Sequence, residues 1–193
     1  MFTAAYLRRT GICTTDLTTR PADTMFAAIA EAGYAAVQFG FSTVTDTDYT
    51  ADGKIEFPDC KELLKNGTME RIRNAAEAHG IAIAAVNGTF NMAHPDPAVR
   101  VEAVRRFDSF LAASKYLGAS IVSLCSGTRY ADHLWTYDPA NRTDEAWRDM
   151  LDSMCRCTEL AERYDLILAV ETEASNVIST PEDARRLLDT VGS

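Results

Sequence analysis

The sequence alternates short apolar runs with glycine-ended helical segments, and this alternation is the strongest constraint on its fold. Strands that alternate with helices form parallel βαβ units, because parallel neighbours need a long crossover connection. We therefore expect an α/β fold with five βα units. The five apolar runs are GICTT (11–15), AAVQFG (35–40), IAIAAVNG (81–88), ASIVSLCSG (119–127) and LILAVE (166–171).

Capping residues, prolines and glycines mark where the intervening helices start and stop. Polar caps satisfy orphan backbone donors, proline suits the first helical turn, and glycine permits the backbone conformation that ends a helix. The expected helices run from Pro21 to Gly33, from Asp59 to His79 with an interruption near Asn66, from Asp96 to Gly118, from Thr143 to about Tyr164, and onward from Thr180.

Two architectures are compatible with five such units: an open doubly wound sheet, and the first five units of a (β/α)₈ barrel. The 193 residues fit one domain, 1–193, whereas eight units take about 250 residues. Doubly wound sheets usually carry a glycine-rich phosphate loop after the first strand, but GICTTDLTTRPAD contains one glycine. The pattern leaves both architectures open.

Charge and cysteine usage limit the partners and the compartment. A net charge of −9 argues against nucleic acid, whose partners usually present a basic face. The five cysteines form no Cys-x-x-Cys pair, which is typical of reduced thiols. The first residues have no long apolar stretch after their charges, and no run is long enough to span a membrane. We expect a cytoplasmic protein with no membrane partner.

Glu171, at the end of the last apolar run, is the strongest candidate for chemistry. Ligands of βα folds gather at the carboxyl ends of the strands. Strand alternation places Glu171 and Glu173 on one side, and a carboxylate there is costly unless it is paired, hydrogen-bonded or bound to a metal. The alternative is a salt bridge or an exposed loop acid, and for Glu173 this alternative is equally strong.

Other polar residues follow the remaining runs, and each has a structural alternative. His94 could ligate a metal or carry a proton, or it could cap the next helix. Asn87 could bind sugar hydroxyls or form a turn. Arg129 could clamp a carboxylate or phosphate, or form an ion pair, and Trp135 in the same loop could simply pack. Gln38 could contact a hydroxyl or be a satisfied buried amide.

Three segments together resemble the sugar phosphate isomerase/epimerase family, a xylose isomerase-like (β/α)₈ barrel group. They are VNGTFNMAHPDP, LGASIVSLCSGTRYADHLWTYDPANRTDEAW and AVETEASNVISTPEDARRLLD. The resemblance implies a barrel in which Glu171 ligates a divalent metal, commonly Mn²⁺, Mg²⁺, Co²⁺ or Zn²⁺. It also matches His94 to the family's histidine after the third strand, which helps to bind metal or substrate. The family's Gly-Thr-Arg loop after the fourth strand matches Gly127, Thr128 and Arg129, and the family's asparagine matches Asn176.

The sequence departs from the family pattern in two places. Gln38 stands where the second strand often carries an acid, and the family's remaining Asp, His and Glu ligands come from strands six to eight, beyond Ser193. The resemblance therefore implies aldose–ketose isomerisation or epimerisation through an enediolate in the complete enzyme, with Glu171 on the metal and with His94 and Arg129 positioning a sugar or sugar phosphate. The alternative is a non-catalytic, truncated barrel that binds a sugar and self-associates through its open sheet edges.

Overall fold

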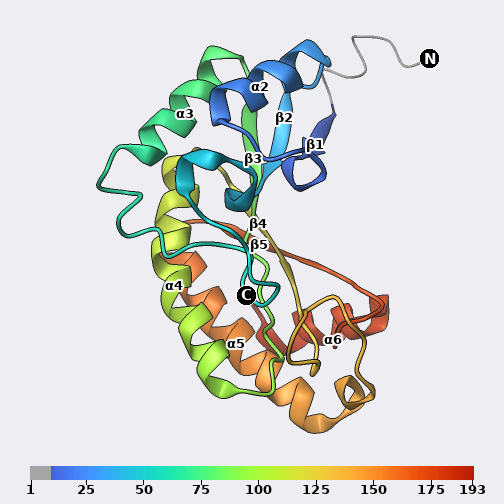
Figure 1. Ribbon diagram of the computed structural model, residues 1–193. Helices are drawn as coiled ribbons and strands as arrows, with labels where there is room; N and C mark the ends of the chain where they lie inside the picture. Colours follow the sequence, from blue (N-terminus) through green and yellow to red (C-terminus); the bar gives the residue numbers. More distant parts are fainter. Residues whose placement is uncertain (1–9) are drawn as a thin grey trace, which may run out of the picture.

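The computed structural model describes residues 10–193 and contains a five-stranded parallel sheet in the order β1-β2-β3-β4-β5 (Figure 1). The strands are β1 (Gly11–Cys13), β2 (Ala36–Phe39), β3 (Ala82–Asn87), β4 (Ile121–Cys125) and β5 (Ile167–Glu171). Each strand lies inside one predicted apolar run, so the prediction of five βα units is confirmed. The prediction that residues 1–17 form no secretory signal concerns a segment whose first nine residues lie outside the described residues.

Helices follow the strands as expected, with one difference. The helices are α2 (Ala22–Glu31), α3 (Thr68–Ala78), α4 (Pro97–Tyr116), α5 (Asp144–Arg163) and α6 (Pro181–Val191), and short 3₁₀ helices are η1 (Thr14–Asp16), η2 (Phe41–Thr43), η3 (Thr45–Thr47) and η4 (Pro139–Arg142). The helix expected from Asp59 begins only at Thr68. Gly67 precedes it with a φ of 79°, a left-handed conformation that interrupts helical hydrogen bonding, and residues 60–67 form turns instead.

Polar caps explain where the last three helices begin. The side chains of Asp96 and Thr143 accept hydrogen bonds from backbone N–H groups in the first turns of α4 and α5. At α6, Thr180 and Asp183 form a reciprocal capping box. Among residues 10–193, no helix is both long and apolar enough to cross a membrane.

The sheet is curved like part of a barrel. On its concave face the Gln38 amide donates a hydrogen bond of 2.6 Å to the Ser123 hydroxyl, reaching from β2 to β4 past β3, and accepts one of 3.2 Å from the Cys13 thiol. Burial raises the pKa of the Cys13 thiol, and the charges of Asp16 and Glu171 raise it further. In a flat sheet β1 and β5 would lie about 19 Å apart, which is too far for the charge of Glu171 on β5 to act on the Cys13 thiol on β1.

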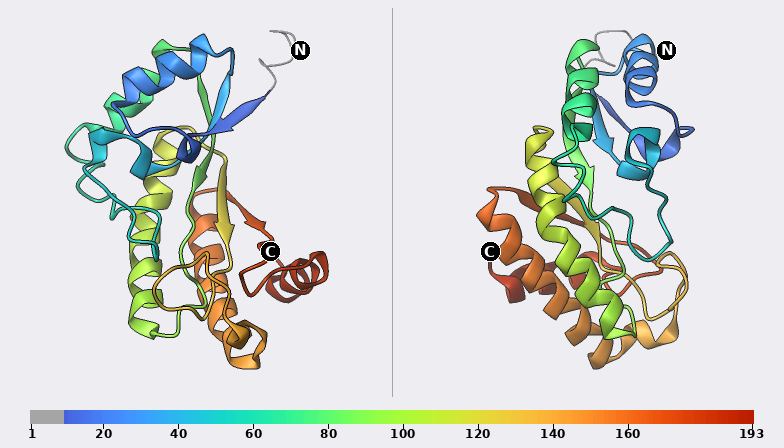
Figure 2. Two further views of the ribbon diagram at one scale, coloured as in Figure 1. Left: turned by 45° about the vertical axis from the view of Figure 1, so that its right-hand side comes forward. Right: turned by 60° about the vertical axis from the view of Figure 1, so that its left-hand side comes forward.

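Helices α2, α3, α4 and α5 lie on the convex side of the strands (Figure 2). A doubly wound sheet would carry helices on both faces. The barrel expectation is confirmed, and the open doubly wound alternative is wrong.

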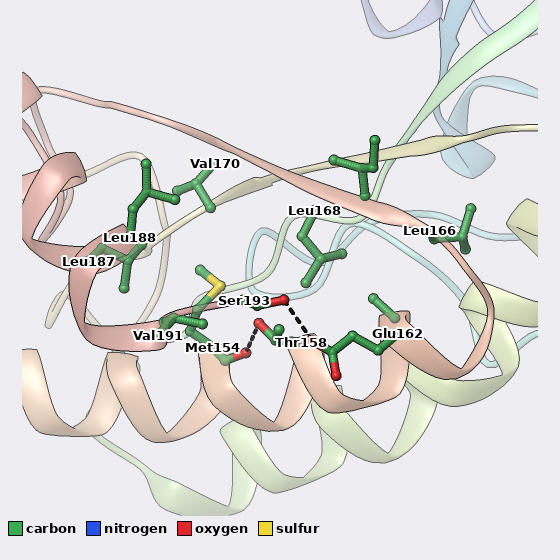
Figure 3. Close-up of a pocket in the computed structure, with 12 residues that line it drawn as sticks. Met154, Thr158, Glu162, Leu166, Leu168, Val170, Leu187, Leu188, Val191 and Ser193 are labelled. Carbon is green, nitrogen blue, oxygen red and sulfur yellow. Dashed lines mark hydrogen bonds between the residues drawn. The ribbon is translucent and has the colours of Figure 1, made fainter.

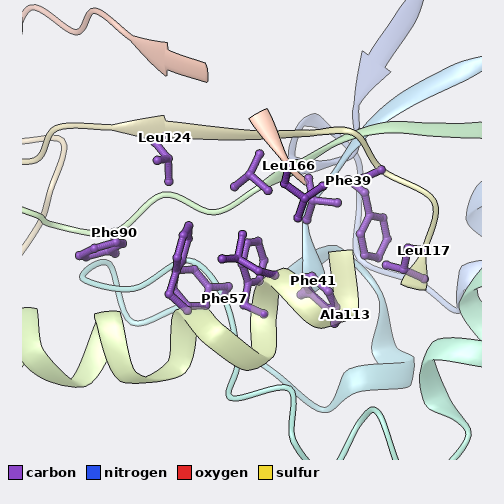
Figure 4. Packing of buried hydrophobic residues seen from close by; sticks show 14 of the residues in the cluster. Phe39, Phe41, Phe57, Phe90, Ala113, Leu117, Leu124 and Leu166 are labelled. Atoms are coloured by element: carbon purple, nitrogen blue, oxygen red, sulfur yellow. The ribbon is translucent and has the colours of Figure 1, made fainter. Parts of the chain in front are cut away.

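Aromatic side chains fill the layer between the sheet and α4 (Figure 4). Phe57 is fully buried, with its ring centroid 4.5 Å from that of Phe110 and 5.7 Å from that of Phe107. Phe57 belongs to residues 48–67, the long connection between β2 and α3, which we call the strap. Ile55 of the strap forms an antiparallel bridge with Phe90. These contacts fix the strap across the end of β3, so Glu56 occupies a defined place.

Replacing the central ring tests whether the strap depends on this packing. Phe57→Ala is expected to lower the free energy of unfolding by about 3–5 kcal/mol, through lost apolar contact and the cavity left behind. Urea unfolding followed by circular dichroism measures the loss. The matched control is Val101→Ala, because Val101 is 58% exposed on α4 and its truncation should cost less than about 0.5 kcal/mol. Equal losses in the two variants would contradict the packing argument.

Candidate functional site

Three side chains converge where β4 and β5 end. Cys125 is the direct neighbour of Glu171 in the parallel register, and Glu173 follows two residues later. The Cys125 sulfur and one carboxylate oxygen from each glutamate all lie within 4.8 Å of one another. Cys125 is buried, Glu171 is exposed and Glu173 is half-buried. We call these three residues the mouth cluster.

Backbone contacts between two loops bring Glu173 back toward β4. The amide of Val177 donates to the carbonyl of Gly127 at 2.9 Å, and the amide of Glu173 itself donates to the carbonyl of Ile178 at 3.0 Å. Gly127 has a φ of 75°, and a Cβ there would stand 2.3 Å from the side-chain oxygen of Asn91, so only glycine fits. The loop after β5 therefore folds against the loop after β4.

Negative charge accumulates at the mouth cluster without a cationic partner. Burial raises the pKa of the Cys125 thiol to about 12, with further contributions from Glu171, Glu173 and Glu56, while a hydrogen bond from Thr89 opposes the rise. Within residues 10–193, the carboxylates of Glu171 and Glu173 form no hydrogen bond or ion pair. Two carboxylates this close repel one another, and a bound cation would relieve that repulsion.

The geometry fits a divalent metal ion. Two carboxylates that converge on one point, with one of them open to solvent, are common ligands of hard divalent cations. Glu171 and Glu173 would hold such an ion at the mouth, where a substrate could also reach it.

The strap contributes Glu56, which sequence reasoning missed. Burial raises the pKa of the Glu56 carboxyl and Asp52 raises it further, whereas His133 and a hydrogen bond from the Trp135 side chain oppose the rise. Glu56 also acts on the Cys125 thiol, so it lies near the mouth cluster. The available signal was the alternation of buried Ile55, Glu56 and buried Phe57, which turns Glu56 away from the core.

Of the predicted substrate contacts, Trp135 is the most accessible. It is 40% exposed in the loop that follows β4 and touches Glu56. Gln38 lies on the concave face with its amide already bonded to Cys13 and Ser123. The Asn87 side chain accepts a hydrogen bond of 3.0 Å from the Thr89 amide, which is a turn-forming contact.

His94 is held inside the loop structure. It is 3% exposed, with Nε2 lying 2.8 Å from the carbonyl oxygen of Ala131 and Nδ1 accepting a 3.0 Å hydrogen bond from the Asp96 amide. This pattern assigns the ring proton to Nε2 and leaves neither nitrogen available to a metal. The Arg100 guanidinium also contacts the His94 carbonyl oxygen. The geometry favours the capping alternative for His94.

Arg129 is likewise committed to neighbouring groups. Its side chain is 10% exposed, and its guanidinium lies 2.6 Å from Asp149 and 2.9 Å from Glu145, both on α5. The ion-pair alternative is therefore favoured for Arg129.

Asn176 is fully buried and links two loops. Its side-chain oxygen accepts a hydrogen bond of 2.9 Å from the Gly127 amide, and its nitrogen donates one of 3.0 Å to the Leu134 carbonyl. Asn176 thus supports the mouth without facing it.

Comparison with known proteins identifies relatives of this arrangement. The family model described as "Xylose isomerase-like TIM barrel" matches residues 26–193. Among solved structures, D-psicose 3-epimerase from Clostridium cellulolyticum H10, in a structure with D-tagatose, is similar with a TM-score of 0.67 and 15% identity, over 94% of this chain and 59% of that chain. No curated protein sequence matches this chain.

Two further similar structures contain metals. A xylose isomerase-like TIM barrel protein from Mycobacterium smegmatis, in complex with magnesium, gives a TM-score of 0.67 at 13% identity, over 100% of this chain and 63% of that one. The IOLI protein with a bound zinc atom gives a TM-score of 0.58 at 18% identity, over 95% of this chain and 60% of that one. The chain therefore spans about three fifths of the length of these structures.

The raised pKa of Glu56 predicts a specific pH dependence of stability. The native state holds this proton to higher pH than the unfolded chain does, so the free energy of unfolding should fall as pH rises from the ordinary glutamate pKa through the raised native value. In Glu56→Gln this fall should be absent, so the free energy of unfolding of the variant should increase relative to that of the wild type as pH rises. Urea unfolding between pH 4 and about pH 8 measures the difference. Glu159→Gln, at an exposed site on α5, serves as the control. Parallel profiles for wild type and Glu56→Gln would refute the burial argument.

Proposed function

The chain belongs to the xylose isomerase-like TIM barrel family, and we propose that it serves in the divalent-metal-dependent isomerisation or epimerisation of a sugar. The observation that carries this proposal is the pair of carboxylates of Glu171 and Glu173 at the carboxyl ends of the strands, which have no partner among residues 10–193. Similar structures include sugar epimerases, among them the D-psicose 3-epimerase described above. The metal could be Mn²⁺, Mg²⁺, Co²⁺ or Zn²⁺.

Each residue at the mouth has a distinct task in this proposal. A divalent ion, when bound, would polarise the sugar carbonyl and its adjacent hydroxyl. Glu171 and Glu173 would each hold that ion through one carboxylate oxygen, and the second oxygen of Glu173 would move the proton between the carbons of an enediolate pathway. Glu56, whose pKa is raised by burial, is suited to hold a proton near the substrate oxygens.

The remaining predicted residues would bind or position the substrate. Trp135 presents an exposed ring beside Glu56, where it could pack on a sugar face. Gln38 and Asn87 line the strand ends and could exchange their internal hydrogen bonds for sugar hydroxyls. The bonds of His94 and Arg129 favour a positioning role for both, because they fasten the loop that carries Trp135.

Sugar binding without turnover is the second candidate function. The observation that favours it is that the side chains of His94 and Arg129 are both held in internal bonds, so neither is free to take part in proton transfer. Binding of a ketose, measured by calorimetry, without proton exchange would support this alternative over catalysis. A cytoplasmic location is also proposed, supported by five cysteines that all occur as free thiols.

We further propose that the open edge of β5 pairs with a second copy of the chain. Ile167 on β5 is 63% exposed, and a mainly apolar cavity of about 290 Å³ lies between β5, α5 and α6 (Figure 3). Unpaired strand edges that border apolar surface tend to associate. Light scattering coupled to size exclusion should give a dimer or larger assembly, and Ile167→Lys should shift it toward monomer. A monomeric wild type would contradict this proposal.

Proton exchange tests the catalytic proposal directly. The full chain, loaded in turn with Mn²⁺, Mg²⁺, Co²⁺ and Zn²⁺, is incubated with ketohexoses and aldohexoses in D₂O, and deuterium at the carbon beside the carbonyl is followed by NMR. Wild type should incorporate deuterium, and Glu171→Gln should lower the rate by a factor on the order of 10²–10⁴. Glu31→Gln, an exposed residue at the end of α2, is the matched control. Absence of exchange with every metal and sugar would overturn the catalytic proposal.

A further inference from the structure

The position of Cys125 in the mouth cluster goes beyond a pair of metal-binding carboxylates. Cys125 is 2% exposed, yet its sulfur lies with oxygens of Glu171 and Glu173 in a group whose members are all within 4.8 Å of one another. A buried cysteine in apolar surroundings would be a packing residue. Cys125 instead lies beside two carboxylates that form no hydrogen bond or ion pair with any other group in residues 10–193.

The distances among the three atoms suit one metal ion bound by all of them. Zinc binds sulfur at about 2.3 Å and carboxylate oxygen at about 2.0–2.2 Å, so two ligands on one ion lie about 3.5–4.4 Å apart, depending on the angle between them. The observed group needs only a small side-chain rotation to reach these spacings. Glu171 can supply this rotation, because its side chain is exposed and makes no hydrogen bond or ion pair in the described part of the chain.

A buried hydroxyl lies beside the sulfur. Thr89 follows β3, is 3% exposed and contacts Cys125 through its side chain. A hydroxyl in such a place can orient a metal ligand through an outer hydrogen bond. The strand register fixes the other side of the site, because Cys125 and Glu171 are direct partners on β4 and β5.

We infer that Cys125 is itself a metal ligand and that the mouth cluster binds zinc in preference to magnesium through one thiolate and two carboxylates. The inference rests on the proposed metal site at Glu171. A thiolate favours zinc-type ions, whereas magnesium is bound through oxygen. Three protein ligands leave the fourth position of a tetrahedral ion open, as in catalytic zinc sites. When the sulfur–metal bond forms, the thiol releases its proton to solvent.

Cobalt substitution provides a direct readout of the sulfur ligand. The full chain, stripped with a chelator, is titrated with Co²⁺, and the near-ultraviolet sulfur-to-cobalt charge-transfer band is recorded together with competition by Zn²⁺ and Mg²⁺. The wild type should show the band, saturating at one equivalent, and zinc should displace cobalt while magnesium does not. Cys125→Ser should lose the band and weaken zinc binding by a factor on the order of 10–100 or more.

Two further variants separate ligand loss from structural damage. Cys157→Ser, at a buried cysteine on α5 outside the mouth cluster, should keep the band. Thr89→Val should keep the band but weaken zinc binding by about 10–100-fold, because it removes only the hydroxyl beside the sulfur. Thermal unfolding of each metal-free variant confirms that it is folded. Persistence of the band in folded Cys125→Ser, or equal affinity of the wild type for zinc and magnesium, would overturn the inference.

The outcome is independent of the sugar reaction. A cobalt band without deuterium exchange would support Cys125 as a metal ligand and contradict the catalytic proposal. Exchange without a band would do the reverse, because the two carboxylates alone would then hold the ion.

Discussion

The parallel register of β4 and β5 is the constraint on which the site depends. Direct partners on neighbouring strands lie about 4.8 Å apart with their side chains on the same face, and in this register Cys125 stands opposite Glu171. A slip of one residue would turn one of them to the opposite face. The loops that follow extend the constraint, since the bond from Val177 to Gly127 returns Glu173 to the same place.

The charges around this site explain why a cation from outside the chain is expected there. Arg129, in the loop after β4, and Arg100, on α4, both form ion pairs with Asp149 of α5. Glu171 and Glu173 keep no such partner within residues 10–193. A carboxylate pair that remains uncompensated while nearby arginines are used to fasten loops is an arrangement suited to a metal.

Local sequence signals were sufficient for most of the fold but for only part of the site. Apolar runs and caps such as Thr143 located the strands and helices, because these depend on nearby residues. Glu171 could be chosen as a candidate from the sequence for the same reason, because strand alternation is a local pattern. Glu56 was not, because its place is set by packing of Phe57 on α4, some fifty residues along the chain. One of the two hydrogen bonds that hold His94 comes from Ala131 in a distant loop, which no local pattern discloses, whereas the other comes from Asp96, two residues away.

In the metal site proposed here, Cys125, Glu171 and Glu173 share one ion at the end of β4 and β5. Anomalous diffraction at the zinc absorption edge, from crystals grown with zinc, would locate that ion. We expect one strong peak at bonding distance from the Cys125 sulfur, about 2.3 Å, and from an oxygen of each glutamate. A peak bound elsewhere, or none at this cluster, would contradict it.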